Sequence, residues 1–95
     1  MSDNDITTGQ ATVTAAGTAE LLIAMGQRST RITIKALADN TDDIYIGPST
    51  VDSADGFILA AGEEVTIVVE QGETNIYIDS AVNGEGVSYI YWCGN

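Results

Sequence analysis

Alternating hydrophobic and polar residues run along most of the chain, and this period of two is typical of β-strands with one buried face. The clearest run is Arg31–Ala36, in which Ile32, Ile34 and Ala36 share one face. The run Glu64–Glu70 repeats the pattern with valine and isoleucine on its inner face. Both runs predict strands that are buried on one side and exposed on the other.

Weaker runs of the same kind complete a set of about eight expected strands. Turn-forming Gly, Asn, Asp and Pro residues separate them, at a spacing typical of β-sandwiches. We expect these further strands over residues 10–15, 19–25, 43–47, 56–60, 75–79 and 86–93. The pattern predicts an all-β, antiparallel sandwich, jelly-roll-like, that occupies residues 10–95 as a single domain.

Two segments need separate interpretation. Thr18–Ala24 contains good helix formers, but it is short and lies between β-rich stretches, so we favour a strand there. Residues 1–9 contain Ile6 as their one hydrophobic anchor apart from Met1, and we expect them to form a flexible N-terminal arm.

The composition supports the same fold class and narrows the function. The chain has 11 Ile, 7 Val and 11 Thr against 4 Leu, which favours strands. Its 14 acidic and 3 basic residues give a net charge of −11, which disfavours nucleic acid or an anionic membrane as a partner. There is no histidine and a single cysteine, Cys93, so most enzyme mechanisms lack their usual groups. We therefore expect no enzymatic activity and no cofactor.

The last predicted strand has apolar side chains on both faces. Tyr89 and Tyr91 point to one side, while Ile90 and Trp92 point to the other. Such a strand is either central and covered by loops, or part of a subunit interface, where Tyr and Trp are enriched. With two further outward aromatics on other predicted strands, the predicted interface residues are Tyr89, Tyr91, Trp92, Tyr45 and Tyr77.

Two acidic segments, Asp39–Asp43 and Asp52–Gly56, gather oxygen atoms of the kind that calcium prefers. Neither has the spacing of a calcium-binding loop, and Asx residues that cap turns explain both, so we predict no metal site.

No carboxylate pair stands out as a glycosidase site. Cys93 is expected to be a small buried hydrophobic residue, and Gly62 to supply a backbone angle that other residues resist.

Several of these turn-and-strand motifs resemble those of small structural proteins of tailed bacteriophages. The motifs are Ile34–Thr41, Ile44–Gly47, Gly56–Leu59, Gly62-Glu63 and Ile76–Ile78. The resemblance implies a capsid decoration (cement) protein or small appendage, commonly a homotrimer. Such a protein is made in the host cytoplasm and binds the major capsid protein on the outer surface of the virion.

Two other functions stay open at this point. A carbohydrate- or receptor-binding module of a fibre or tail would use exposed Tyr45, Tyr77 and Trp92 for stacking. A calcium-dependent adhesive domain would use the Asp39–Asp43 segment. Burial of the aromatics between subunits would favour the structural role, and their exposure in a groove would favour sugar binding.

Overall fold

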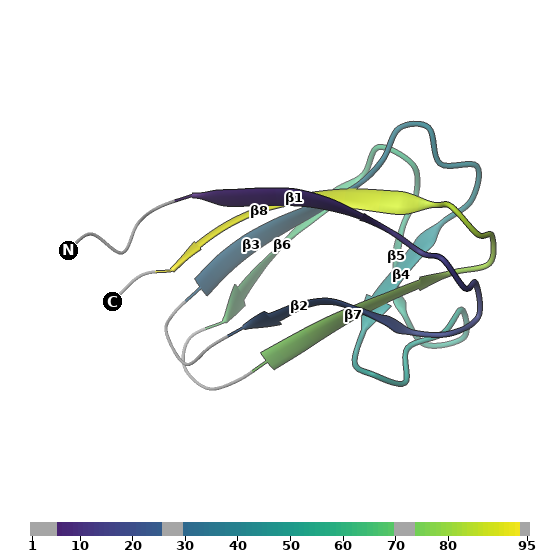
Figure 1. The fold of residues 1–95 in the computed structure, drawn as a ribbon, viewed down its shortest axis with the longest axis horizontal. Coiled ribbons are helices and arrows are strands. Elements are labelled where there is room, and N and C mark those ends of the chain that lie inside the picture. Colours follow the sequence, from purple (N-terminus) through teal and green to yellow (C-terminus); the bar gives the residue numbers. More distant parts are fainter. Residues whose placement is uncertain (1–5, 26–29, 70–73, 94–95) are drawn as a thin grey trace.

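The computed structural model describes residues 6–25, 30–69 and 74–93, which form eight β-strands and no helix (Figure 1). The strands are β1 (Thr7–Thr12), β2 (Glu20–Met25), β3 (Thr30–Ala36), β4 (Ile44–Gly47), β5 (Phe57–Leu59), β6 (Glu64–Val69), β7 (Thr74–Ser80) and β8 (Gly86–Cys93). This confirms the all-β prediction. Within the described ranges there is accordingly no helix long and apolar enough to cross a membrane.

The strands form two four-stranded antiparallel sheets that face each other (Figure 1). Sheet A has the order β1-β8-β3-β6, and sheet B has the order β2-β7-β4-β5. The chain passes repeatedly from one sheet to the other, and its last strand pairs with its first. This is the double-sheet arrangement of a jelly roll, so the sandwich prediction is confirmed.

The core lies between the sheets and is built from the inward positions of the alternating runs. Ile32, Ile34 and Ala36 are fully buried, as the sequence pattern predicted. The other buried members of this core are Val13, Ile44, Ile46, Leu59, Ile76, Ile78 and Val87. Because every second residue points inward, each short strand adds at most three apolar side chains to the core, and the core needs both sheets.

One boundary differs from the sequence prediction. β1 begins at Thr7, so the last part of the segment predicted as an arm pairs with β8, from Thr7 opposite Tyr91 to Gly9 opposite Tyr89. Backbone pairing explains this, because a polar edge strand needs little hydrophobic anchoring of its own. For the Thr18–Ala24 segment the favoured strand is confirmed, because the segment forms no helix and enters β2 at Glu20.

Side-chain oxygens hold the loops at the end of the sandwich where β1 ends and β8 begins (Figure 1). The carboxylate of Glu85 is 6% exposed and accepts hydrogen bonds from the backbone N–H groups of Thr41 and Asp42, the latter at 2.6 Å. The amide of Asn40 donates to the carbonyl of Gly86 and accepts from its N–H, both at 2.9 Å. The 37–43 loop is thereby tied to the start of β8.

Candidate functional site

Strand β8 directs its aromatic side chains to two sides of sheet A. Tyr89 and Tyr91 pair with buried residues of β3 and pack against the core, with ring centroids 6.1 Å apart. Ile90 and Trp92 alternate with them and lie on the outer face, where Ile90 is 37% exposed. The two tyrosines therefore contribute to the sandwich interior, and Trp92 is the aromatic residue that β8 presents on its outer face.

Gly9 in β1 makes room for the ring of Tyr89. The two residues are opposite each other in the β1–β8 register. A Cβ atom at position 9 would overlap the phenol oxygen and lie 2.6 Å from ring atom Cζ of Tyr89. The ring thus covers a glycine in the edge strand, and it packs against backbone where a side chain would otherwise stand.

Trp92 and Arg31 form a pair on the outer face of sheet A. They are opposite each other in the β3–β8 register, and the guanidinium carbon lies 5.8 Å from the centre of the indole ring. At that distance the cation is attracted to the face of the ring. Lys35 points outward from the same strand, so the outer face of sheet A carries both of the described basic side chains.

The predicted contact residues Tyr45 and Tyr77 lie on sheet B, and a loop covers one of them. Tyr45 is only 8% exposed. The 48–56 loop folds against it, because a Cβ atom at Gly56 would lie 2.5 Å from the Cβ of Tyr45 and 2.9 Å from Val51. Tyr77 is half-buried opposite Leu21. The five predicted interface residues therefore do not share one surface, and Tyr45 has little area available for a partner.

Burial and nearby carboxylates make the phenol of Tyr45 a weaker acid. Burial is the largest cause of this change in pKa, and the negative charges of Asp42, Asp43 and Asp79 act in the same direction. Together they raise the pKa of the phenol above its ordinary value of 10.0. Tyr45 is thus held in its neutral form beneath the loop.

Asp79 is the buried carboxylate on this side of sheet B. It is 2% exposed, and its Oδ1 accepts hydrogen bonds from the backbone N–H of Gly17 at 2.9 Å and of Ser80 at 2.8 Å. These bonds attach the 13–19 loop to the end of β7 and satisfy the charge without a cation. The sequence pattern did not identify Asp79 as important, because the partner at Gly17 is 62 residues away along the chain.

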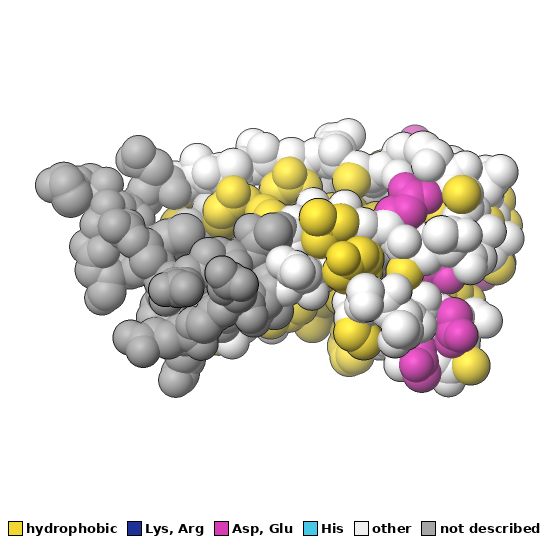
Figure 2. All heavy atoms as spheres, turned by 60° about the horizontal axis from the view of Figure 1, so that its bottom comes forward, with side chains coloured by type: hydrophobic (Ala, Val, Ile, Leu, Met, Phe, Trp, Pro, Cys, Tyr) yellow, Lys and Arg dark blue, Asp and Glu magenta, His cyan; other side chains and the backbone are white. Residues whose placement is uncertain are grey.

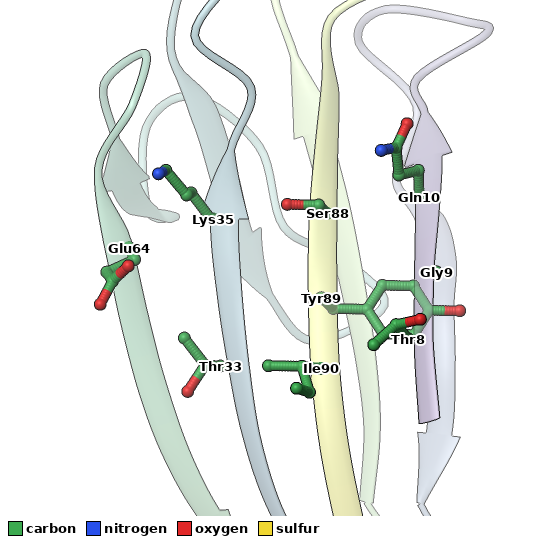
Figure 3. A pocket seen from close by; sticks show the side chains of 9 residues that line it. All are labelled: Thr8, Gly9, Gln10, Thr33, Lys35, Glu64, Ser88, Tyr89 and Ile90. Carbon is green, nitrogen blue, oxygen red and sulfur yellow. The ribbon is translucent and has the colours of Figure 1, made fainter. Parts of the chain in front are cut away.

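The outer face of sheet A contains a shallow groove with a volume of about 390 Å³ that crosses all four strands (Figure 3). Most of its lining residues are outward-facing residues from alternate positions of these strands, which the register brings side by side, and Gly9 and Tyr89 from the inward-facing positions between them also line it. The lining consists of Thr8, Gly9, Gln10, Thr33, Lys35, Glu64, Ser88, Tyr89 and Ile90. Sequence reasoning missed this groove, although the alternation already placed Ser88 and Ile90 on one face.

The acidic turns that were considered for calcium use their carboxylates to bind backbone. The Oδ1 atom of Asp42 accepts from the N–H of Asp43 at 2.7 Å, and that of Asp52 accepts from the N–H of Ala54 at 2.9 Å. Figure 2 shows acidic side chains gathered toward the end of the molecule where the loops lie. Among the described residues, no three Cys, Asp or Glu side chains are placed to hold a metal ion.

Two further predictions concern parts of the chain outside the described residues. These are the side chain of Cys93 and residues 1–5 of the N-terminal segment. The predicted backbone angle at Gly62 is confirmed, because its φ is 84°, in the left-handed region that favours glycine.

The chain was compared with known proteins. No family model matches it, and no curated protein matches its sequence. Its fold is similar to that of a solved chain from Bacillus endospore appendages, described as a novel family of disulfide-linked pili. The TM-score is 0.55 at 17% sequence identity, and the match covers 99% of this chain and 93% of the other. At this identity the similarity shows the fold.

Proposed function

We propose that this protein is a non-enzymatic structural subunit that assembles with copies of itself through the open edges of sheet A. The observation that carries the proposal is the difference between the edges of the two sheets. In sheet A both edge strands, β1 and β6, are six residues long and regularly paired on their inner side. Edge strands of this kind offer a row of backbone groups to another strand.

The edges of sheet B are poorly suited to such pairing. β5 is three residues long, and the register of β2 shifts between Leu21 and Ile23. Short strands and bulges are devices that prevent edge-to-edge association. In contrast, β1 contains neither a charge nor a proline, and β6 contains one charged residue, Glu64. Sheet A is therefore the sheet that would be extended.

The strand directions allow copies to join in a continuous series. Each neighbouring pair in sheet A is antiparallel, so β6 runs antiparallel to β1 across the sheet. A second copy in the same orientation would place its β1 antiparallel to β6 of the first. Head-to-tail contacts of this type produce a ring when the rotation closes and a filament when it does not.

The fold comparison supports a structural role by analogy. A similar fold occurs in a chain from the Bacillus endospore appendages that are described as pili. Because one fold can carry many functions, this analogy adds to the edge geometry and does not replace it. An extracellular fibre and a particle shell both require the same property, which is regular contact between copies.

The finer proposal, which the bacteriophage resemblance carries, is a homotrimer that decorates the outer surface of a virion by binding the major capsid protein. A closed ring of three copies is compatible with the edge geometry. Light scattering after size exclusion would then give close to three times 9.9 kDa. Locating the protein in an electron-microscopy map of intact particles would test the capsid partner directly.

Edge pairing can be tested with lysines on β6. The double variant Thr66→Lys, Val68→Lys should reduce the mass measured by light scattering, since lysines on an edge strand oppose pairing. The control Ser49→Lys, Ser53→Lys makes the same change of net charge in the exposed 48–56 loop, and its mass should not fall. A wild-type protein that stays at 9.9 kDa at high concentration and at raised ionic strength would contradict self-assembly.

A further inference from the structure

We propose that the groove on the outer face of sheet A binds a neutral oligosaccharide. Its volume of about 390 Å³ lies within the range of small-molecule sites, about 300–1,000 Å³. The groove lies across the strands of one rigid sheet, so its residues are held in a fixed arrangement without any loop (Figure 3). This inference does not depend on self-assembly, because one protomer supplies every lining residue.

The polar groups of the groove suit a ligand that carries many hydroxyl groups. Thr8, Thr33 and Ser88 contribute hydroxyls, and Gln10 contributes an amide. Each of these groups can both donate and accept a hydrogen bond, as a sugar hydroxyl can. Thr33 shares a bond of 2.8 Å with Thr66, which orients its oxygen and leaves further capacity for a ligand.

The charge of the groove argues for a neutral ligand. Lys35 and Glu64 are the charged residues in its lining, and they are opposite each other in the β3–β6 register. A phosphate or sulfate site needs several donors or cations that converge without a carboxylate beside them. The local charges cancel here, even though the chain as a whole carries −11.

An apolar surface runs along β8 beside these polar groups. Ile90 lines the groove, and Trp92 follows it on the same outer face. Sugars have apolar C–H faces that pack on such side chains, while their hydroxyls bind polar neighbours. The indole ring already has Arg31 over it, at 5.8 Å, and this pair stands at the flank of the groove.

Sheet extension would leave this groove accessible. Pairing through β1 and β6 uses the edges of sheet A, whereas the groove lies on its outer face. An assembly of this kind would repeat the site in every copy, and weak single sites then act together on a polymeric glycan. Edge pairing together with a sugar site in each copy would give an assembly that adheres to glycans.

The experiment is an NMR titration of the ¹⁵N-labelled protein with maltotriose, cellotriose, mannotriose and triacetylchitotriose at millimolar concentrations. We expect at least one of them to shift the amide signals of Thr8–Gln10, Thr33–Lys35 and Ser88–Ile90. The fluorescence of Trp92 should change in parallel, and Trp92 is the single tryptophan of the chain.

Matched threonine variants locate the site. Thr8→Ala should raise the dissociation constant roughly three- to tenfold, the loss expected for one hydrogen bond. Thr12→Ala removes the same group from the same face of β1 outside the groove and should leave the constant unchanged. Both positions are exposed, so the fold should tolerate each change.

Four outcomes would overturn the proposal. One is that none of the four trisaccharides shifts the groove signals, and another is that the shifts fall on the 48–56 loop instead. A stronger response to inorganic phosphate would make the groove an anion site. Shifts of the central-strand signals of Thr33–Lys35 and Ser88–Ile90 on raising the protein concentration alone would show that a second copy occupies the groove, because pairing at the edges would act on β1 and β6.

Discussion

The outer faces of the two sheets show how similar strands can present different surfaces. On sheet B, Tyr45 points outward but lies beneath the 48–56 loop, and Asp79 beside it is 2% exposed and bonded to the 13–19 loop. On sheet A, Trp92 and most of the groove residues also point outward, and the face remains accessible. Alternation directs a side chain outward, but a loop decides whether it can reach a partner.

The edge strands of sheet A are also more accessible to a partner than those of sheet B. Sheet B ends in a three-residue strand and a strand with a register shift, and its outer face is partly closed by loops. Sheet A ends in two regular strands and leaves its face open. We infer that sheet B and its loops stabilise the protomer, while sheet A carries its interactions.

The largest expected effect comes from forcing the loop away from sheet B. In Gly56→Val, the new Cβ atom would overlap the Cβ of Tyr45 and a methyl group of Val51. Overpacking of this kind costs roughly 1–3 kcal/mol, and the direct overlap places Gly56→Val at the upper end. Urea denaturation measures the loss, with Ser53→Ala in the same loop as a control near wild type. An unchanged unfolding free energy would show that the loop does not pack on Tyr45.

A smaller effect is expected from alkaline pH. Because the pKa of Tyr45 is raised above 10.0, the folded protein keeps a proton that the unfolded chain has lost. The stabilisation from the neutral phenol is complete below pH 10 and disappears as the pH rises through the folded pKa. Tyr45→Phe should remove this dependence from denaturation curves measured on both sides of that value.

The variant Asp79→Asn tests one cause of the raised pKa of Tyr45. The amide keeps an oxygen for the N–H groups of Gly17 and Ser80 but removes one of the charges that raise the pKa of Tyr45. Ultraviolet titration of the phenols should show the highest-pH step move to lower pH. A step that stays in place would mean that this carboxylate does not act on Tyr45.

The smallest effect is expected on the open face of sheet A. Arg31→Ala removes the cation above Trp92, and an exposed pair of this kind contributes about 0.5–1 kcal/mol. Lys35→Ala, on the same face of β3, lacks that ring contact and serves as the control. Thermal unfolding followed by Trp92 fluorescence compares the two. Equal effects would show that the pair adds no stability.

Trp92→Ala separates two ways in which copies could meet. The sequence-based hypothesis places Trp92 in a subunit contact, so the variant should weaken self-association. Edge pairing alone predicts an unchanged mass by light scattering, because the indole lies on the face of sheet A and not at its edge.

Much of the fold was predictable from the sequence because strand formation depends on neighbouring residues. The alternation in Arg31–Ala36 placed Ile32 and Ile34 in the core, and both are fully buried. The turn at Gly62 was predictable for the same reason, since a positive φ is a local requirement. The start of β1 was not predictable from the sequence, because Thr7–Gly9 are held by pairing with β8 at the other end of the chain.

The candidate site was less accessible to sequence reasoning. Trp92 was correctly placed on an outward face, but the hydroxyls of Thr8, Thr33 and Ser88 in the groove come from three strands distant in sequence. Their proximity follows from a register in which Thr8 lies opposite Ile90, and Thr33 lies opposite both Ile90 and Thr66. No local pattern specifies which strands become neighbours.

The amino-acid sequence alone determined the strands, their inward faces and the strongly acidic character of the chain, because periodicity and composition act over a few residues. The tertiary structure decided which outward faces stay open. That outcome depends on the 48–56 loop folding onto Tyr45, on the ring of Tyr89 lying over Gly9, and on the strand order that leaves β1 and β6 at the edges. Each of these contacts joins elements whose positions are set only when both sheets pack together.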